Sequence, residues 1–205
     1  MGSDNLYKKR RQRNDYRRKT AMRETKDTFL IVCEGTKTEP YYFEGFKLKS
    51  AEVKVIGEGC TPHRLVQQAI LHGKKESYDQ VWVVFDRDDH PKSDINNAFQ
   101  LAENNHIQVA YSNEAFELWY LLHFQYMVAK LTRHDYIERL SEKLGVKYRK
   151  NIKDMYERLL ERQRTAIRNA EKLIDFHHTS SNFNRIDSKP HTTIHHLVHE
   201  LNRFM

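Results

Sequence analysis

The chain has 205 residues, a length that suits one domain or one domain with an appendage. Hydrophobic residues make up 39% and charged residues 31%, which is enough for a hydrophobic core beneath a highly charged surface. The longest apolar runs, such as VWVVF at 81–85, are too short to cross a bilayer, and no apolar segment of the signal-peptide type opens the sequence. Two cysteines argue against a disulfide framework. We therefore expect a cytoplasmic protein without a membrane segment.

The basic character of the chain is concentrated at its N-terminus. Residues 1–27 contain ten Lys or Arg, among them Arg10 and Arg11, against four Asp or Glu, whereas the remaining 178 residues contain 25 basic and 24 acidic groups. Such an arm, which we expect to be flexible, is suited to bind the phosphates of a nucleic acid. A solvated leader, or a contact with an acidic partner protein, explains the same composition.

From residue 28 to about 130, short apolar runs alternate with helical patterns. The four predicted strands cover 28–34, 52–57, 81–86 and 107–112. Helices are predicted from about Thr38, from Pro62, around Ile95 and over 114–124. Strands that alternate with helices predict an α/β domain with a mainly parallel sheet flanked by helices.

The character of the sequence changes after residue 130. Residues 132–176 show helical periodicity with many charges, interrupted near Gly145, and residues 180–190 resemble a loop. A last short helix is predicted, with an apolar face made of Ile194, Leu197, Val198 and Leu201. We therefore expect residues 131–205 to form a helical extension that packs on the α/β domain. Seven glycines and no glycine-rich phosphate loop argue against a nucleotide fold built on such a loop.

Acidic residues follow two of the predicted strands. Glu34 follows the first strand, and Asp86 ends the third in the run Asp86-Arg87-Asp88-Asp89. If the strands are neighbours, their carboxylates converge at the carboxyl edge of the sheet and raise each other's pKa values. A hard cation such as Mg²⁺ or Mn²⁺ removes that penalty. On an extended segment Asp86 and Asp88 point the same way, so we expect both to address one metal ion. Carboxylates at strand ends also serve as helix caps or ion-pair partners.

The fourth predicted strand leads into the stretch SNEAFELWYLLHF. Glu114 and Glu117 are three residues apart, so we expect them on one face of a helix that Asn113 caps. Glu117 is a candidate metal ligand or base. The large apolar residues of the stretch are expected in the core rather than on a stacking surface; they are Phe116, Trp119, Leu121, Leu122 and Phe124.

Basic residues with a candidate role in substrate binding occur at two places. Lys37, in the loop after the first strand, is placed to hold a scissile phosphate, or is simply solvated. Tyr148, Arg149 and Lys150 in KYRKN form a small basic and aromatic group suited to a nucleic-acid backbone, although charge runs of this type are usually only exposed.

Histidines recur every four residues near the C-terminus. His191, His195 and His199 are spaced to line one side of a helix, and such a pattern can bind zinc. Apart from Glu200, no further ligand is placed to complete a tetrahedral site. We therefore expect solvated histidines rather than a zinc site.

Four stretches, in this order along the chain, resemble the RloB-like family: IVCEGTKTEPYYFEGFK, VWVVFDRDDH, SNEAFELWYLLHF and KPHTTIHHLV. The resemblance extends from about residue 28 to the C-terminus. These bacterial proteins in turn resemble Toprim domains, the catalytic module of topoisomerases, primases and OLD-type nucleases. A Toprim site pairs a glutamate after its first strand with a D-x-D after a later one. The resemblance therefore implies that Glu34 is a general acid/base or metal ligand and that Asp86 and Asp88 bind the metal. Asp89 has no assigned role in that pattern.

The resemblance also implies a function. Toprim domains cleave or join phosphodiesters with Mg²⁺, and RloB-like proteins are associated with restriction and phage-defence loci, often beside an ABC/AAA-type ATPase. We expect a Mg²⁺- or Mn²⁺-dependent endonuclease of DNA or RNA, tRNA included, that acts in antiviral defence with such an ATPase. Two alternatives stay open: a regulatory subunit without catalysis that binds nucleic acid or the ATPase, and a primase-like nucleotidyl transferase. A homodimer is compatible with the sequence.

Overall fold

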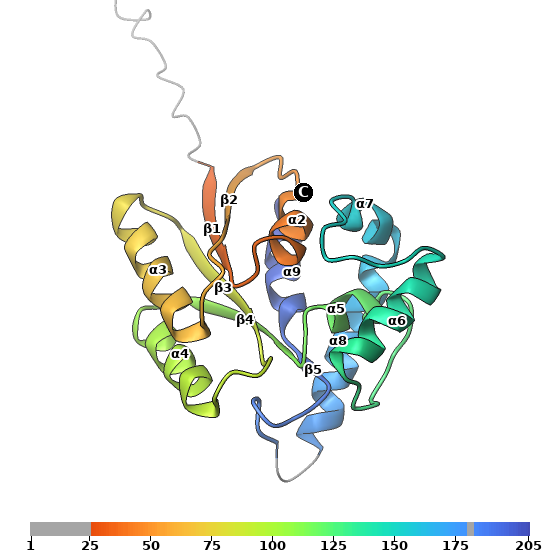
Figure 1. Ribbon diagram of the computed structural model, residues 1–205. Helices are drawn as coiled ribbons and strands as arrows, with labels where there is room; N and C mark the ends of the chain where they lie inside the picture. The colour runs from red at the N-terminus through yellow and green to blue at the C-terminus, as the bar shows by residue number, and fades with distance from the viewer. Residues whose placement is uncertain (1–25, 180–182) are drawn as a thin grey trace, which may run out of the picture.

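The computed structural model describes residues 26–179 and 183–205, so the predictions for Arg10, Arg11 and the rest of the basic arm lie outside the described residues. A five-stranded sheet in the order β2-β1-β3-β4-β5 forms the centre of this part of the chain (Figure 1). The first four strands are parallel, and β5 is antiparallel to β4. The strands are β1 (Asp27–Cys33), β2 (Ala51–Gly57), β3 (Gln80–Asp86), β4 (Gln108–Asn113) and β5 (His191–Thr192). The predicted α/β class and the four predicted strands are confirmed.

Helices cover both faces of the sheet (Figure 1). On one face lie α3 (Pro62–Lys75) and α4 (Lys92–Asn104), and on the other lie α2 (Thr38–Glu44), α5 (Glu117–Leu122) and α9 (Ile194–Asn202). The remaining helices are α6 (Arg133–Leu144), α7 (Met155–Leu159), the 3₁₀ turn η1 (Leu160–Arg162) and α8 (Gln163–His178). Because β1 and β3 are buried on both faces over most of their length, Phe29–Cys33 and Val81–Phe85 are continuous apolar runs rather than alternating patterns. Within the described ranges, no helix is long and apolar enough to cross a membrane.

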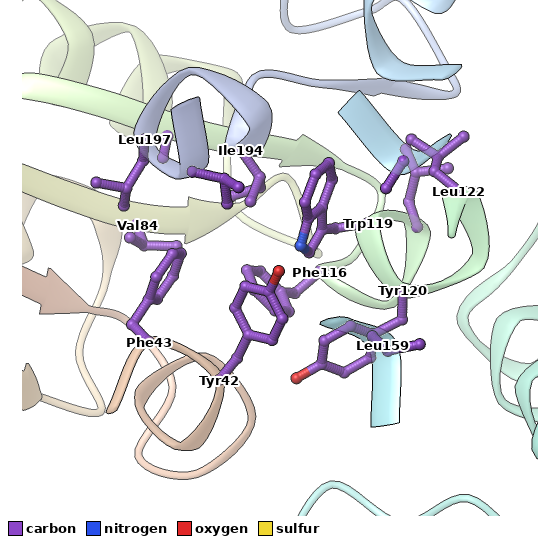
Figure 2. Packing of buried hydrophobic residues seen from close by; sticks show 14 of the residues in the cluster. Tyr42, Phe43, Val84, Phe116, Trp119, Tyr120, Leu122, Leu159, Ile194 and Leu197 are labelled. Atoms are coloured by element: carbon purple, nitrogen blue, oxygen red, sulfur yellow. The ribbon is translucent and has the colours of Figure 1, made fainter. Parts of the chain in front are cut away.

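The larger of two hydrophobic clusters joins α2, α5 and the C-terminal helices. Figure 2 shows the Tyr42 ring in this cluster near Phe116, Trp119 and Tyr120. The ring centroid of Tyr42 lies 5.9 Å from that of Phe116 and 6.4 Å from that of Trp119, both in edge-to-face geometry. Each such pair contributes about 0.5–1.5 kcal/mol beyond the burial of its surface. The expectation that Phe116, Trp119, Leu121 and Leu122 belong to the core is confirmed, and Phe124 packs partly buried against it.

The C-terminal extension returns to the sheet. As predicted, Ile194, Leu197, Val198 and Leu201 of α9 are fully buried. The short strand β5 precedes this helix and pairs with Ser112 and Asn113 of β4. Two residues are too few to give a strand pattern in a sequence, so β5 was not predicted.

Two of the three C-terminal histidines are buried, so the prediction of solvated side chains is wrong for His191 and His195, whereas His199 is exposed as expected. His191 belongs to β5 and His195 to α9, and their exposed fractions are 2% and 3%. The three do not line one side of a helix, because His191 lies outside α9, which contains His195 and His199. Burial, reinforced by neighbouring histidines, lowers the pKa of His191 to about 4 and that of His195 to about 3. Both imidazoles are therefore neutral at pH 7, which allows them to lie in an apolar setting.

Candidate active site

Glu34 and Asp86 lie side by side at the carboxyl ends of β1 and β3. These strands are neighbours, with Cys33 opposite Val84, so the next residues of both strands meet at one edge of the sheet. The Glu34 backbone N–H donates to the Val84 carbonyl at 2.8 Å, and the Asp86 backbone N–H donates to Glu34 Oε2 at 3.1 Å. The structure thus brings together the two strand-end acids that the sequence singled out.

A cleft with a volume of about 390 Å³ opens at this edge of the sheet. Glu34, Asp86 and Asp88 all line it. Its other charged or titratable lining residues are Glu39, Cys60, His90, Arg133 and Lys150. The cleft therefore joins carboxylates from the strand ends with cationic groups from beyond residue 130.

Asp86 is one of the two buried acids among the residues that line the cleft. Its exposed fraction is 8%, and its Oδ1 atom is buried without a hydrogen-bond partner among the described residues. Burial raises the pKa of Asp86, and the nearby carboxylates of Glu39, Glu117 and Glu34 raise it further. A buried carboxylate oxygen without a partner is costly, and it is the kind of group that a cation stabilises.

Glu39 is a site residue that the sequence reasoning missed. It lies in the first turn of α2 with an exposed fraction of 6%, and a Cβ atom added at Gly35 would overlap its carboxylate. Burial first, and then the charges of Glu117 and Glu34, raise the pKa of Glu39 to about 7. A signal for it was present, since a helix that follows a strand end directs its first turn toward the carboxyl edge of the sheet. An acid in the first turn of the helix predicted from Thr38 was therefore a candidate.

Glu117 is buried close to the cleft but does not line it. Its exposed fraction is 3%, and the Tyr148 hydroxyl donates to its Oε1 at 3.1 Å. Lys150 Nζ lies 4.0 Å from the same oxygen. The charge of Glu117 acts on the cleft from there, because it raises the pKa values of Asp86 and Glu39.

The helix that carries Glu117 is shorter than predicted. It begins at Glu117, so Glu114 lies before it and forms an ion pair with Lys189 instead of sharing a helix face with Glu117. Asn113 does not cap the helix. Its amide donates to the carbonyls of Ile186 at 2.8 Å and Ser188 at 2.9 Å, which fixes the end of β4 to the C-terminal segment.

Asp88 does not point the same way as Asp86 along an extended segment, and that geometric expectation is wrong. The chain leaves β3 after Asp86, and Asp88 has a φ of +36° in the turn that follows. The Asp88 carboxylate pairs with Arg133 Nη2 at 2.6 Å, and Glu34 Oε1 lies 2.5 Å from His90 Nε2. Both acids still face the cleft, but each is engaged by a basic partner.

Not all of the predicted basic residues lie in the cleft. Lys150 lines it, whereas Lys37 and Arg149 are exposed and do not. Tyr148 is buried and holds Glu117, so it is not the surface residue that the KYRKN pattern suggested. Asp89 is exposed and does not line the cleft.

The cleft offers the type of ligand that a hard divalent cation prefers. Glu34, Glu39 and Asp86 supply carboxylate oxygens, and Asp86 Oδ1 has no hydrogen-bond partner among the described residues. As the side chains stand, no group of three His, Cys, Asp or Glu residues in 26–179 and 183–205 is arranged to hold a metal ion. In this arrangement the Asp88 carboxylate is paired with Arg133, and the Glu34 carboxylate is paired with His90. Coordination by these acids would therefore require rotation of their side chains.

Comparison with known proteins identifies one family. Residues 29–201 match a family model described as RloB-like protein. No curated protein and no solved structure matches the chain.

Proposed function

We propose, from the premise that this chain belongs to the RloB-like protein family, that it is a Mg²⁺- or Mn²⁺-dependent nuclease that hydrolyses phosphodiester bonds of DNA or RNA. One observation carries the proposal: Asp86, with its buried and unpartnered Oδ1, lies among the carboxylates of Glu34, Glu39 and Glu117. Such a cluster is costly to a folded protein unless a cation occupies it. A binding subunit without catalysis has no evident need for it.

Electrostatics support a cation at this position. The pKa values of Glu34, Glu39 and Asp86 are all raised, with burial as the largest cause. Each is raised further by at least one of the neighbouring acids. Lys150 is exposed and 4.0 Å from Glu117, so it compensates only part of this negative charge. A divalent cation would favour the ionised form of all three acids at once.

The residues of the cleft have distinct roles in the proposed reaction. Glu34, Asp86 and Glu39 would hold the metal ion, which when bound polarises a phosphoryl oxygen and lowers the pKa of a water molecule. Glu34 is also hydrogen-bonded to His90, so this pair can hold a proton beside the phosphodiester that would be cleaved. Arg133 and Lys150 also line the cleft, and they are the cations that would orient a phosphate.

The family resemblance supports a proposal for the wider role of the protein. We extend the proposal to a cytoplasmic effector of antiviral defence that acts with an ABC/AAA-type ATPase. Lys37 and Arg149 are exposed and would contact the substrate outside the cleft. Asp88 would join the metal ligands once its ion pair with Arg133 opens.

The test is cleavage of a mixed panel of plasmid DNA, single-stranded DNA and total tRNA in Mg²⁺, Mn²⁺ or chelator. Asp86→Ala and Glu34→Gln should each lower metal-dependent cleavage by at least ~100-fold while the circular-dichroism spectrum stays that of a folded protein. Glu44→Gln, at an exposed position of α2, is the matched control and should cleave like the wild type.

Full cleavage by either site variant would contradict the proposal. The alternative of a regulatory subunit makes the opposite prediction in cells. Carboxylate variants would then keep the defence phenotype, and deletion of residues 1–27 would abolish it.

A further inference from the structure

Strand β2 is the outermost strand at one side of the sheet (Figure 1). It pairs with β1 residue for residue over Ala51–Gly57, and no other strand within 26–179 and 183–205 pairs with its outer side. Proteins commonly protect such an edge with a proline or a β-bulge, and β2 contains neither. The outer side of β2 is therefore able to pair with another strand.

The backbone of β2 leaves one set of hydrogen-bonding groups unused. The Glu58 backbone N–H donates to the Cys33 carbonyl at 3.0 Å, at the end of the β1–β2 ladder. Since successive residues of a strand direct their N–H and C=O groups to opposite sides, the even-numbered residues of β2 face β1. Ala51, Val53 and Val55 therefore direct theirs outward, and no loop or helix of the described part of the chain bonds to them.

The side chains of β2 differ between its two faces. Val53 and Val55 pack, partly buried, against the larger hydrophobic cluster, whereas Glu52 and Lys54 are exposed on the other face. Lys54 Nζ lies 2.7 Å from Glu76 Oε2 in an exposed ion pair. An ammonium group has three donors, so Lys54 can pair with a second carboxylate at the same time. The edge thus presents one acid and one base, two residues apart.

We propose that β2 pairs antiparallel with β2 of a second copy of this chain, about a twofold axis at Val53. In this register Val53 lies opposite its own copy and Ala51 lies opposite Val55, so the three outward-facing residues exchange hydrogen bonds across the axis. Glu52 lies opposite Lys54 of the partner subunit, and the symmetry produces this pair twice. Residues opposite each other in such a pair have Cα atoms about 4.5 Å apart, close enough for their charges to interact.

The charges select this register among those that the backbone permits. Two sets of outward groups bond only when odd-numbered residues lie opposite odd-numbered ones, which places the axis on a residue. An axis at Glu52 or at Lys54 sets like charges opposite each other, which is destabilising. An axis at Val55 sets Lys54 opposite Ile56. Among the axes within 52–55, the one at Val53 alone pairs the acid with the base.

The test is sedimentation velocity over a range of protein concentrations, in chelator so that no metal ion links two chains. We expect the wild type to dimerise with a Kd below about 50 μM. Glu52→Lys sets a lysine opposite Lys54 of the partner subunit, and Lys54→Glu sets a glutamate opposite Glu52 of the partner subunit. Each variant alone should therefore dimerise at least about tenfold more weakly than the wild type.

An equimolar mixture of the two variants should dimerise at least about tenfold more tightly than either variant alone. In the mixed dimer both cross-strand pairs again have opposite charges, so affinity returns although each chain still carries its substitution. A variant that had failed to fold would not recover in this way. The measurement does not use nuclease activity, and the inference does not rest on the proposed function.

Glu103→Lys is the matched control, since it makes the same charge reversal at an exposed position of α4, which packs on β4. It should dimerise like the wild type, and all variants should keep the thermal midpoint of unfolding within a few degrees. Hydrogen exchange of the backbone amides in 51–57 should slow as the concentration of wild-type protein rises, because the outward-facing amides become bonded in the dimer.

A wild type that stays monomeric, a dimer that Glu52→Lys leaves unchanged, or a mixture no tighter than its components would each overturn the inference. Exchange in 51–57 that does not depend on protein concentration would overturn it too. Either another part of the same chain would then cover this edge, or the dimer would form through a different surface.

Discussion

Replacement of Glu39 by glutamine should stabilise the protein at alkaline pH in the absence of metal. Glutamine keeps the size of the side chain and stays neutral. Burial and the charges of Glu117 and Glu34 raise the pKa of Glu39 from 4.5 to about 7. Each pKa unit corresponds to about 1.36 kcal/mol, so ionisation of Glu39 lowers the free energy of unfolding by roughly 3 kcal/mol.

The pH dependence has a defined sign. Between pH 4.5 and about 7, Glu39 of the unfolded chain has lost its proton whereas Glu39 of the native protein retains it. The native state therefore binds more protons, and its stability falls as pH rises through this window and levels off above it. The pKa of Asp86 is raised partly by Glu39, so the variant should also lose part of the Asp86 contribution, which has the same sign.

The measurement is urea and thermal unfolding in chelator from pH 4.5 to pH 8. At pH 8 we expect Glu39→Gln to exceed the wild type by up to roughly 3 kcal/mol, or about 10 °C in the thermal midpoint for a chain of this length. Near pH 4.5 the two proteins should converge. Glu44→Gln, on the exposed side of the same helix, should stay within about 0.5 kcal/mol of the wild type throughout. Parallel stability curves for Glu39→Gln and wild type would refute the electrostatic reasoning.

Two further predictions concern the partners of the acids. Arg133→Met removes the cation that lies 2.6 Å from Asp88, so Mn²⁺ should raise the thermal midpoint more in this variant than in the wild type. An equal rise would show that the ion pair does not compete with metal binding. Tyr148→Phe removes the donor to the buried Glu117 and should lower the free energy of unfolding by about 1–3 kcal/mol in urea. A loss below about 0.5 kcal/mol would mean that Lys150 alone satisfies Glu117.

Most of the fold could be predicted because its elements carry local signals. The strands β1 and β3 contain the continuous apolar runs Phe29–Cys33 and Val81–Phe85, and α9 shows its buried face at helical spacing. The errors occur where distant contacts decide the structure. The helix after β4 starts late because the Asn113 side chain binds carbonyls at Ile186 and Ser188, more than 70 residues away. Nothing in the local pattern of SNEAFELWYLLHF indicates that contact.

The candidate site was predictable only in part, for the same reason. Parallel strands end at the same edge of a sheet, so the meeting of Glu34 and Asp86 follows from the order of strands and helices. The orientation of Asp88 does not, because it depends on the turn after β3 and on Arg133. Glu39 was missed because an acid in the first turn of a helix has a sufficient local explanation in the helix dipole.

The segment beyond residue 130 supplies side chains that pair with the acids of the cleft, in addition to packing against the α/β domain. Arg133 begins α6 and pairs with Asp88, while Tyr148 and Lys150 lie in the connection after α6 and contact Glu117. A chain that ended at residue 130 would leave the buried Glu117 without its hydroxyl donor, and a buried carboxylate without a partner is strongly destabilising. The acids come from the strand ends and the helices that follow them, whereas these compensating groups come from the extension. We therefore expect this cluster of carboxylates to be stable only when both parts of the chain are present.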